Sequence, residues 1–340
     1  MSKVLVIGPN YHNYLDAVAA AFRELGWEPF VEGFDTPVHP YSPLMRMRYK
    51  LARDKAPLRE RSRRRFSEYI GTRFDALAPD LVFIINGDNL LPSVVERFRS
   101  SARVALWLFD NRAALPPSEE LARKVDALFC FSRADVDSFL ADGVPAHFLP
   151  QACDTQCYRP VPGCRKDIDI LFIGNMYCSP RRKELMTAVA ERFSDRKVVA
   201  YGWYQPWFKG PVAGLRRPYK KVFKDVNIPP QEVNLLYNRA RVVLNIHRGH
   251  QNDGANPRVF EICGSGAYQV CDRNPYVESL FPDGSVGFYG SVEELFGRID
   301  EGLAQDMSSR AADACRTVRA QHSFHNRMEE VLKLLYPDRD

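Results

Sequence analysis

The chain has 340 residues, too many for one ordinary hydrophobic core, so its length predicts two domains. Its composition is globular, with 45% hydrophobic and 26% charged residues and no low-complexity tract or internal repeat. No segment approaches the roughly 18 uninterrupted apolar residues that a membrane-spanning helix needs. The first residues, MSKVLVIGPNYHN, are unlike a signal peptide because their apolar run is only VLVI. We therefore expect a cytoplasmic protein.

The eight cysteines suit buried, reduced thiols better than a disulfide framework, because Cys130, Cys263 and Cys271 lie in apolar strand-like or helical segments. The cysteines at 153, 157 and 164 are close in sequence but lack the paired spacing of a structural zinc site. The sequence therefore predicts neither a metal nor a cofactor.

The net charge of +5 is unevenly distributed. Residues 46–65, RMRYKLARDKAPLRERSRRR, carry ten Lys or Arg against Asp54 and Glu60, so the remainder of the chain is slightly acidic. This segment fits a solvated helical face as well as a patch that meets anionic lipid, a phosphate-bearing acceptor or nucleic acid. The basic and aromatic segment 208–224 has the same two interpretations.

Apolar runs alternate with helical patterns along the chain, which is typical of parallel α/β sheets. The first run, KVLVIG (3–8), precedes an amphipathic helix ended by Gly26. Further strands of a first sheet are expected at 80–87, 103–109, 127–132 and 146–152. Strands of a second sheet are expected at 168–174, 197–202, 241–247, 267–272 and 286–290. The Cys- and Pro-rich segment 153–166 between the two series is interpreted as a linker.

The pattern thus predicts two Rossmann-like halves joined near residue 155. Ligands of such sheets bind beyond the carboxyl ends of the strands, and with two domains the site is expected in a cleft between them. Polar residues follow several predicted strand ends: Gly8-Pro9-Asn10, Asp88, Asp110, Gly174-Asn175 and the stretch NIHRGHQNDGANPRVFEICGSGA at 245–267.

That last stretch contains a helix start. Asn256 is suited to cap the helix, and Pro257 to occupy its first position. The following backbone amides, with the helix dipole and Arg258, form a site suited to a diphosphate. One turn further, Glu261 offers a carboxylate to the hydroxyls of a ribose. The structural alternative is a local ion pair between Arg258 and Glu261 in an ordinary helix.

Other candidates also have an ordinary structural interpretation. Arg181 and Arg182, after Gly174-Asn175, fit either a phosphate contact or a solvated basic helix end. His12 and Asp110 fit either an acceptor site or satisfied loop positions. The absence of G-x-G-x-x-G, Walker, H-E-x-x-H and G-x-S-x-G motifs argues against a dinucleotide dehydrogenase, a P-loop enzyme and the common hydrolases.

Taken together, the segments resemble glycosyltransferases of the GT-B fold, in particular the CgeB-like (spore-maturation type) group of the glycosyl transferases group 1 superfamily. The similar segments are WLFDNR (107–112), CFSRADVDSFLADGVPAHFLPQACDTQCYRP (130–160), DILFIGNMYCSPRRKEL (169–185), LNIHRGHQNDGANPRVFEICGSGAYQV (244–270) and HSFHNRMEEVL (322–332). The resemblance implies two Rossmann-like domains facing each other across a cleft. The first comprises residues 1–155 and a C-terminal helix, 322–340, that crosses back, and binds the acceptor. The second, 156–321, binds the nucleotide-sugar donor.

The resemblance also implies roles for individual residues. Glu261 is similar to the second acid of the Glu-x7-Glu element of retaining group 1 transferases, which binds the donor ribose. The first acid falls on Asp253, near the transferred sugar, where Asp replaces Glu and the intervening loop differs. Arginines in place of a metal face the leaving diphosphate. The expected catalytic residues are Asp253, Arg258 and Glu261. The expected donor-binding residues are Gly174, Asn175, Arg181, Arg182, Tyr201, His247, Arg248, Asn256, Val259 and Phe260. The expected acceptor-side residues are Asn10, His12, Asp88 and Asp110.

We therefore expect a transferase that moves a sugar from a nucleotide diphosphate sugar to a hydroxyl of a glycan, lipid-linked or protein acceptor. Retention of configuration, independence of metals and a role in cell-surface glycan or glycoconjugate synthesis follow from the resemblance. Peripheral contact with the inner face of an anionic membrane through residues 46–65 is expected, and a nucleic-acid partner is not. Two alternatives stay open: a nucleotide-sugar 2-epimerase on the same fold, and a non-catalytic binder of nucleic acid or an anionic surface.

Overall fold

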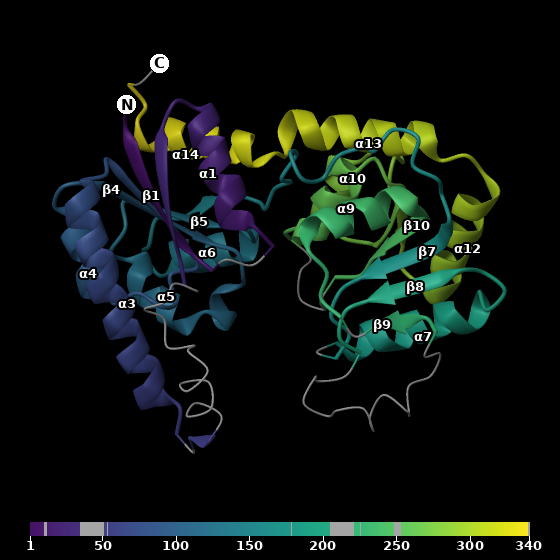
Figure 1. Cartoon of the computed structure of the whole chain (residues 1–340), viewed down its shortest axis with the longest axis horizontal. Helices are drawn as coiled ribbons and strands as arrows, with labels where there is room; N and C mark the ends of the chain where they lie inside the picture. Colours follow the sequence, from purple (N-terminus) through teal and green to yellow (C-terminus); the bar gives the residue numbers. More distant parts are fainter. Residues whose placement is uncertain are drawn as a thin grey trace. The chain divides into compact units, whose positions relative to one another are not determined.

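The computed structural model describes residues 1–9, 12–34, 51–52, 54–177, 179–204, 221–224, 226–247 and 253–338. The chain divides into two compact units, one formed by Met1–Pro150 with Phe324–Asp340 and the other by Gln151–Ser323. Each unit contains one six-stranded sheet in which all paired strands are parallel (Figure 1). None of the helices in these ranges is long and apolar enough to cross a membrane.

The first sheet has the strand order β2-β1-β3-β4-β5-β6. Its strands are β1 (Lys3–Gly8), β2 (Glu28–Gly33), β3 (Leu81–Ile85), β4 (Arg103–Leu108), β5 (Ala127–Cys130) and β6 (His147–Phe148). Its helices are α1 (Tyr14–Glu24), α3 (Ala56–Leu77), α4 (Pro92–Arg99), η1 (Arg112–Ala114), α5 (Pro116–Ala122), α6 (Arg133–Ala141) and α14 (Phe324–Leu335).

The central strands of this sheet are continuous apolar runs because helices cover both faces, as is usual for parallel sheets. All five residues of β3, LVFII, are buried. The C-terminal helix α14 packs beside α1, which lies near the other end of the sequence (Figure 1). Arg327 of α14 donates through Nε to the carbonyl of Pro150 at 2.8 Å, and the Tyr336 hydroxyl donates to the carbonyl of Asp80 at 2.9 Å. These bonds anchor the last helix to the first unit.

The second sheet has the order β12-β11-β10-β7-β8-β9. Its strands are β7 (Ile168–Ile173), β8 (Val198–Tyr201), β9 (Phe223–Lys224), β10 (Ala240–Asn245), β11 (Gln269–Asp272) and β12 (Gly287–Tyr289). Its helices are α7 (Pro180–Arg192), α9 (Pro230–Arg239), α10 (Pro257–Gly264), α11 (Pro275–Leu280), α12 (Val292–Ala304) and α13 (Ser308–Gln321). One apolar cluster packs α9, α10 and α13 on one face of the sheet, and another packs α7 and α12 on the opposite face.

A small residue sets the distance of α10 from the linker. A Cβ atom placed on Gly264 would lie 2.5 Å from Sγ of Cys153, inside the van der Waals limit. The glycine therefore allows α10 to pack directly against the segment that begins the second unit, which agrees with the small residues seen after Glu261 in the sequence.

Candidate active site

The candidate site lies at the carboxyl edge of the second sheet, where the strand order reverses. β7 and β10 are hydrogen-bonded neighbours, but the chain continues from β7 to β8 on one side and from β10 to β11 on the other. Ligands of doubly wound sheets bind at such switch points, because the two loops leave the sheet in opposite directions. The loops after Ile173 and Asn245 carry Gly174, Asn175, His247 and Asn256, and the helices that follow these loops carry Arg181, Arg182, Val259 and Phe260.

Arg182 joins the two central strand ends. Ser179 caps α7 by accepting a hydrogen bond from the Arg182 amide, which places this side chain in the first turn. The guanidinium is buried and donates from Nε and Nη2 to the Ile246 carbonyl, at 2.8 and 2.5 Å, and from Nη1 to the Asn175 carbonyl at 3.2 Å. Arg182 therefore holds the loops after β7 and β10 together.

Arg181, one position earlier, is half-exposed and donates from Nη1 to Oδ2 of Asp272 at 2.8 Å. Asp272 ends β11 and is buried. The two neighbouring arginines thus have different surroundings: one binds backbone carbonyls in the interior, and the other lies at the surface beside a carboxylate.

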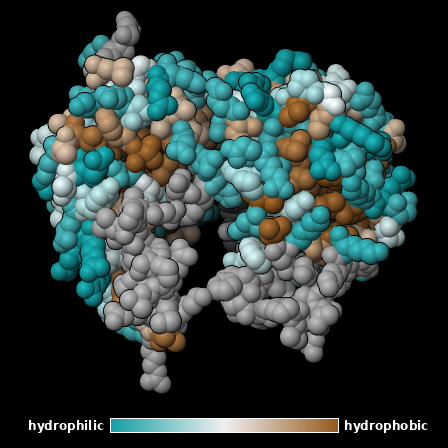
Figure 2. Space-filling view, viewed as in Figure 1, coloured by the Kyte–Doolittle hydropathy of each residue, from teal (hydrophilic) through white to brown (hydrophobic). Residues whose placement is uncertain are grey.

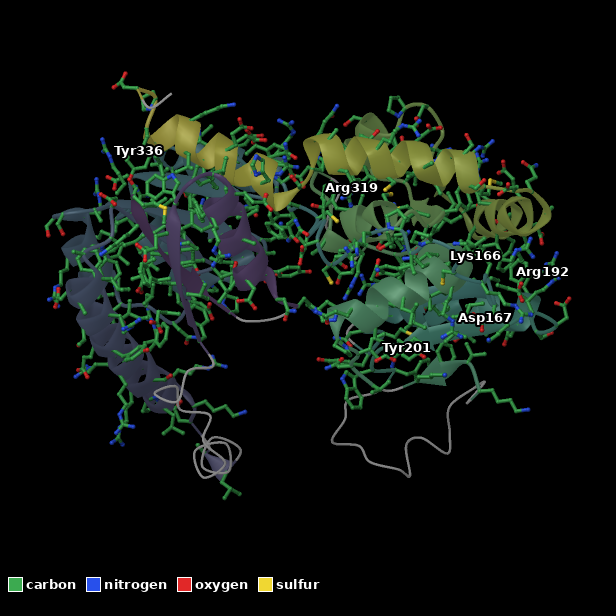
Figure 3. The ribbon with its side chains drawn as sticks, turned by 45° about the horizontal axis from the view of Figure 1, so that its top comes forward. Lys166, Asp167, Arg192, Tyr201, Arg319 and Tyr336 are labelled. Carbon is green, nitrogen blue, oxygen red and sulfur yellow. The ribbon has the colours of Figure 1, made fainter. Side chains whose placement is uncertain are left out.

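The loops after β7 and β8 are tied to each other. The Asn175 side chain accepts a hydrogen bond from the Trp203 amide at 3.2 Å, and the Gly174 amide donates to the carbonyl of Tyr201 at 2.9 Å. Gly202 has φ +119°, and a Cβ there would lie 2.3 Å from the Gly174 carbonyl oxygen. Only glycine allows this approach. Tyr201, labelled in Figure 3, ends β8 and lies under Lys224, whose Nζ is 5.2 Å from its ring centroid.

The predicted helix start at Asn256 is confirmed. Its Oδ1 accepts from the Val259 amide at 3.2 Å, and Pro257 is the first residue of α10. Asn256 also exchanges two amide hydrogen bonds with Asn245 at the end of β10, at 3.0 and 3.2 Å. Val259 and Phe260 are fully buried, so their side chains belong to the core and only their backbone can face a ligand.

Glu261 lies on the first turns of α10 and is fully buried. Its Oε2 accepts from Arg258 Nη1 at 2.5 Å, and the same nitrogen is 3.4 Å from the Tyr237 hydroxyl. Burial raises the pKa of Tyr237 well above its ordinary value, so the phenol stays neutral. The local Arg258–Glu261 pair named as the structural alternative is thus present, and it sits at the helix start where a diphosphate was expected.

The loop before α10 is held from the other side. Asp253 is half-buried, and the next residue, Gly254, accepts a hydrogen bond at its carbonyl from Asn274 Nδ2 at 3.0 Å. Asn274 also caps α11 by accepting from the Tyr276 and Val277 amides. We did not predict Asn274 from the sequence, although Asn274-Pro275 repeats the Asn-Pro signal of the α10 start.

His247 lies two residues beyond the end of β10 and is buried. Its backbone amide and its Nδ1 lie 3.0 and 2.8 Å from Oδ1 of Asp272, and Cys271 Sγ is 3.8 Å from Nδ1. Burial acts to raise the pKa of Asp272, but the hydrogen bonds from His247 and the nearby Arg181 guanidinium outweigh it and leave the pKa below its ordinary value. Asp272 is a second site residue that we did not predict from the sequence. The available signal was a carboxylate at the end of an apolar strand.

Within the described ranges, one group of side chains is close enough together to be considered as a metal site: His247, Cys271 and Asp272. Their potential ligand atoms all lie within 4.8 Å of one another. Both oxygens of the Asp272 carboxylate already accept hydrogen bonds, from His247 and from Arg181. An arginine beside the carboxylate disfavours a cation, so the group is best described as a hydrogen-bond network.

The expected acceptor-side residues belong to the first unit. Its strand order reverses between β1 and β3, and the loops there contain His12 and Asp88. Burial raises the pKa of Asp88, and the nearby Asp110 carboxylate adds to the shift. Asn86, another residue that the sequence did not single out, is buried with φ 61° and accepts from the Phe109 amide at 2.8 Å. Asp110, which follows Phe109, is exposed.

The structure therefore gathers Gly174, Asn175, Arg182, His247 and Asn256 at the edge formed by β7 and β10. Arg181 is connected to this edge by its hydrogen bond to Asp272. Arg258 and Glu261 lie on α10, which begins directly after Asn256. Asn10 and Arg248 lie outside the described residues, as do residues 46–50 and 53 of the basic segment and most of 208–224.

Part of the chain is similar in sequence to glycosyltransferases. A family model described as "Glycosyl transferase-like" matches residues 181–333, a range that includes Arg181, β10, α10 and Asp272. No curated protein sequence matches the chain.

Solved structures resemble the chain over its whole length. Sucrose-phosphate synthase from Thermosynechococcus elongatus aligns with a TM-score of 0.69 at 13% identity, covering 100% of both chains. Anabaena HepE in complex with UDP-glucose aligns with a TM-score of 0.67 at 12% identity, covering 99% of this chain and 100% of that one. A UDP-forming α,α-trehalose-phosphate synthase from Burkholderia xenovorans aligns with a TM-score of 0.66 at 12% identity, covering 100% of both.

At these identities the structural likeness concerns the fold, and it confirms the predicted GT-B architecture. The family match adds the class of activity: the protein is an enzyme of the glycosyltransferase type, as the sequence predicted. The CgeB-like subgroup stays a prediction.

Proposed function

We propose that this glycosyltransferase takes its sugar from a nucleotide diphosphate sugar bound at the carboxyl edge of the second sheet, and delivers it to a hydroxyl acceptor bound by the first unit. The observation that carries the proposal is Glu261, a fully buried carboxylate on α10, paired with Arg258. Burying a charged group costs free energy, so a buried carboxylate usually has a structural or a functional role. Glu261 lies about one turn after the start of α10, at the point where the strand order reverses.

The two charges of this pair have complementary partners in a nucleotide diphosphate. A carboxylate accepts hydrogen bonds from the two hydroxyls of a ribose, and a guanidinium binds phosphate oxygens. When the glycosyl–phosphate bond breaks, negative charge grows on the diphosphate. Arg258 and Arg181 stabilise that charge in this proposal, and Arg182 keeps the loops that carry them in place. Such preorganised electrostatic stabilisation is usually the largest contribution to catalysis.

Uridine diphosphate glucose is the first donor to test, because one of the similar structures contains it. We further propose that configuration is retained, that Asp253 contacts the transferred sugar and that the departing phosphate accepts the proton of the acceptor hydroxyl. No metal and no separate cofactor is needed in this scheme. The acceptor class proposed is a cell-surface glycan or glycoconjugate, in line with the CgeB-like resemblance.

We also propose contact with an anionic membrane through α3. The helix presents Arg61, Arg64 and Arg65 to solvent, and the structure shows no ion pair for these three within the described chain. Figure 2 shows a hydrophilic outer surface along this helix. Each exposed basic side chain near an anionic membrane contributes about 1 kcal/mol of attraction. A membrane-bound acceptor would thereby be brought to the enzyme.

The test begins with thermal shift against UDP-glucose and a panel of other nucleotide sugars, followed by assay of free nucleotide and of the elongated acceptor. Glu261→Ala should abolish stabilisation by the donor that the wild type binds. The matched control is Glu301→Ala, because Glu301 forms the same i,i+3 pair with Arg298 on α12, 3.0 Å apart. Normal donor binding and turnover by Glu261→Ala would rule out the site. Formation of a 2-epimer without acceptor would instead favour the epimerase alternative.

A further inference from the structure

His247 and Asp272 form a buried dyad at the carboxyl ends of two adjacent strands. His247 is only 3% exposed. Its Nδ1 lies 2.8 Å from Oδ1 of Asp272, and the same oxygen accepts a hydrogen bond from the His247 backbone amide at 3.0 Å. Arg181 binds the other carboxylate oxygen at 2.8 Å. Three hydrogen bonds thus fix this carboxylate in one orientation.

This arrangement selects one form of the imidazole. An ionised carboxylate only accepts hydrogen bonds, so the proton of the neutral ring must be on Nδ1. Nε2 then carries the lone pair and is an acceptor. Asp–His pairs of this kind fix both the tautomer and the orientation of the ring in enzymes and metal sites.

The acceptor atom, Nε2 of His247, is buried and has no hydrogen-bond partner among the residues that the structure describes. A buried polar atom left without a partner costs about 1–3 kcal/mol, so such atoms are rare and call for an explanation. The ring cannot relieve this cost by exchanging its two nitrogens, because Asp272 holds Nδ1.

The position of the dyad identifies the missing group. His247 lies on the loop from β10 that leads to Asp253, and Arg181 lies at the start of α7, across the β7–β10 switch point. A lone pair requires a hydrogen-bond donor. Phosphate oxygens are acceptors at neutral pH and are excluded, whereas a sugar hydroxyl can donate.

We propose that His247 is a sugar-binding residue whose Nε2 accepts a hydrogen bond from a hydroxyl of the transferred sugar, and that Asp272 is the positioning residue that holds the ring proton on Nδ1 and fixes the direction of the Nε2 lone pair. This inference rests on the proposed donor site, and it assigns the recognition of the sugar, as distinct from the nucleotide, to the His247–Asp272 dyad. A hydroxyl-binding acceptor of this type discriminates strongly against analogues that lack the hydroxyl, because the acceptor is then left buried without a partner.

The first test needs no substrate. Nitrogen NMR of the histidine rings distinguishes the two neutral tautomers, and the His247 signals are identified by their loss in His247→Gln. The proposal requires the form protonated on Nδ1 in the free protein. In Asp272→Asn, an NH2 donor replaces one of the two acceptor oxygens, so the preference for the tautomer protonated on Nδ1 should weaken. An Nε2-protonated ring in the wild type would overturn the proposal.

The second test separates sugar from nucleotide. Affinity for UDP-glucose should fall about 10-fold or more in His247→Phe, whereas affinity for UDP should stay within about twofold of wild type. Asp167→Asn is the matched control: Asp167 is ion-paired to Arg239 and Lys197 in the same unit but precedes β7, at the opposite edge of the sheet (Figure 3). Equal loss of UDP and UDP-glucose affinity would overturn the inference and leave the donor site standing.

Deoxy analogues of UDP-glucose complete the experiment. Removal of one hydroxyl should weaken binding to the wild type by the same factor as His247→Phe, and should cause no further loss in that variant, as expected for two partners of one hydrogen bond. If every deoxy analogue loses the same factor in both proteins, an ordered water and not the sugar satisfies Nε2, and the proposal falls. If the wild type binds no nucleotide sugar of the panel, the proposed function falls together with it.

Discussion

The side-chain amides of Asn245 and Asn256 exchange two hydrogen bonds and thereby connect the end of β10 to the first turn of α10. Both residues are buried. Asn256 accepts a third bond from the Val259 amide, so one side chain serves as helix cap and as strand tether. The orientation of Arg258 and Glu261 relative to the sheet depends on this pair.

Asn256→Ala should therefore cost more than an ordinary cap. Loss of the cap alone lowers the free energy of unfolding by about 1 kcal/mol. The Asn245 amide is then left buried without its partner, which lowers it by about 1–3 kcal/mol more. Urea denaturation measures the difference. Ser291→Ala is the control, because Ser291 caps α12 by accepting a hydrogen bond from the Glu294 amide. Equal losses in the two variants would contradict the tethering role.

Arg181 and Arg182 should respond oppositely to replacement by alanine. Arg182→Ala leaves the Ile246 and Asn175 carbonyls without their buried donor and should lower the free energy of unfolding by about 2–5 kcal/mol. Arg181→Ala removes a half-exposed pair and should cost about 1 kcal/mol, but should lower kcat about 10²-fold if Arg181 faces the diphosphate. Arg192→Ala, on the same helix, is the control for both measurements. A stable Arg182→Ala protein would refute its tethering role.

For Arg258→Ala we expect a larger loss in kcat than in nucleotide affinity. The charge of the Arg258 guanidinium is offset by Glu261 in the free protein. In the proposed mechanism its interaction with the diphosphate becomes strongest as the glycosyl–phosphate bond breaks. The expected loss is about 10²–10³-fold in kcat. Steady-state kinetics with the donor found by thermal shift, beside direct titration with the free nucleotide, measures the two effects. A loss confined to KM would show that Arg258 only binds the ground state.

Asp88 should give a pH dependence of stability with an unusual sign. Burial raises its pKa in the folded protein, so between the ordinary value and the raised one the native state holds more protons than the unfolded state. Stability then falls as pH rises through this window, and Asp88→Asn should be more stable than wild type at pH 7. The advantage should vanish below about pH 4, where both forms are neutral. Thermal melts across pH test this; a destabilised Asp88→Asn at pH 7 would contradict it.

The proposed membrane contact of α3 predicts a vesicle affinity that depends on charge. Replacing Arg61, Arg64 and Arg65 together with glutamine should weaken binding to vesicles of equal parts phosphatidylglycerol and phosphatidylcholine by about 10²-fold. Added salt should weaken wild-type binding in the same way. The control variant replaces three exposed arginines of the second unit: Arg192, Arg196 and Arg316. Full vesicle binding by the α3 variant would refute the membrane contact. If the wild type binds nucleic acid and the α3 variant does not, the non-catalytic alternative is favoured.

Much of the fold was accessible from the sequence because buried parallel strands are continuous apolar runs. The strands with the longest runs, among them β3 and β4, were all predicted. Two edge strands were missed: β2, EPFVEG, mixes polar and apolar residues, and β9 has only two residues. The expected strand at 146–152 is reduced to His147–Phe148. Edge strands bury one side at most, so their sequence carries little of the signal.

Within the candidate site, local chemistry was predictable and long-range pairing was not. The sequence by itself determined the cap at Asn256, the helix start at Pro257 and the position of Arg258 and Glu261 one turn apart, because helix capping and i,i+3 spacing involve neighbours in the chain. Only the tertiary structure decided that Arg182 binds carbonyls of two strands, that Arg181 binds Asp272 and that His247 meets the same carboxylate. These partners are 64, 91 and 25 residues apart in sequence. They meet because parallel strands bring their carboxyl ends to one edge of the sheet, which no local pattern encodes.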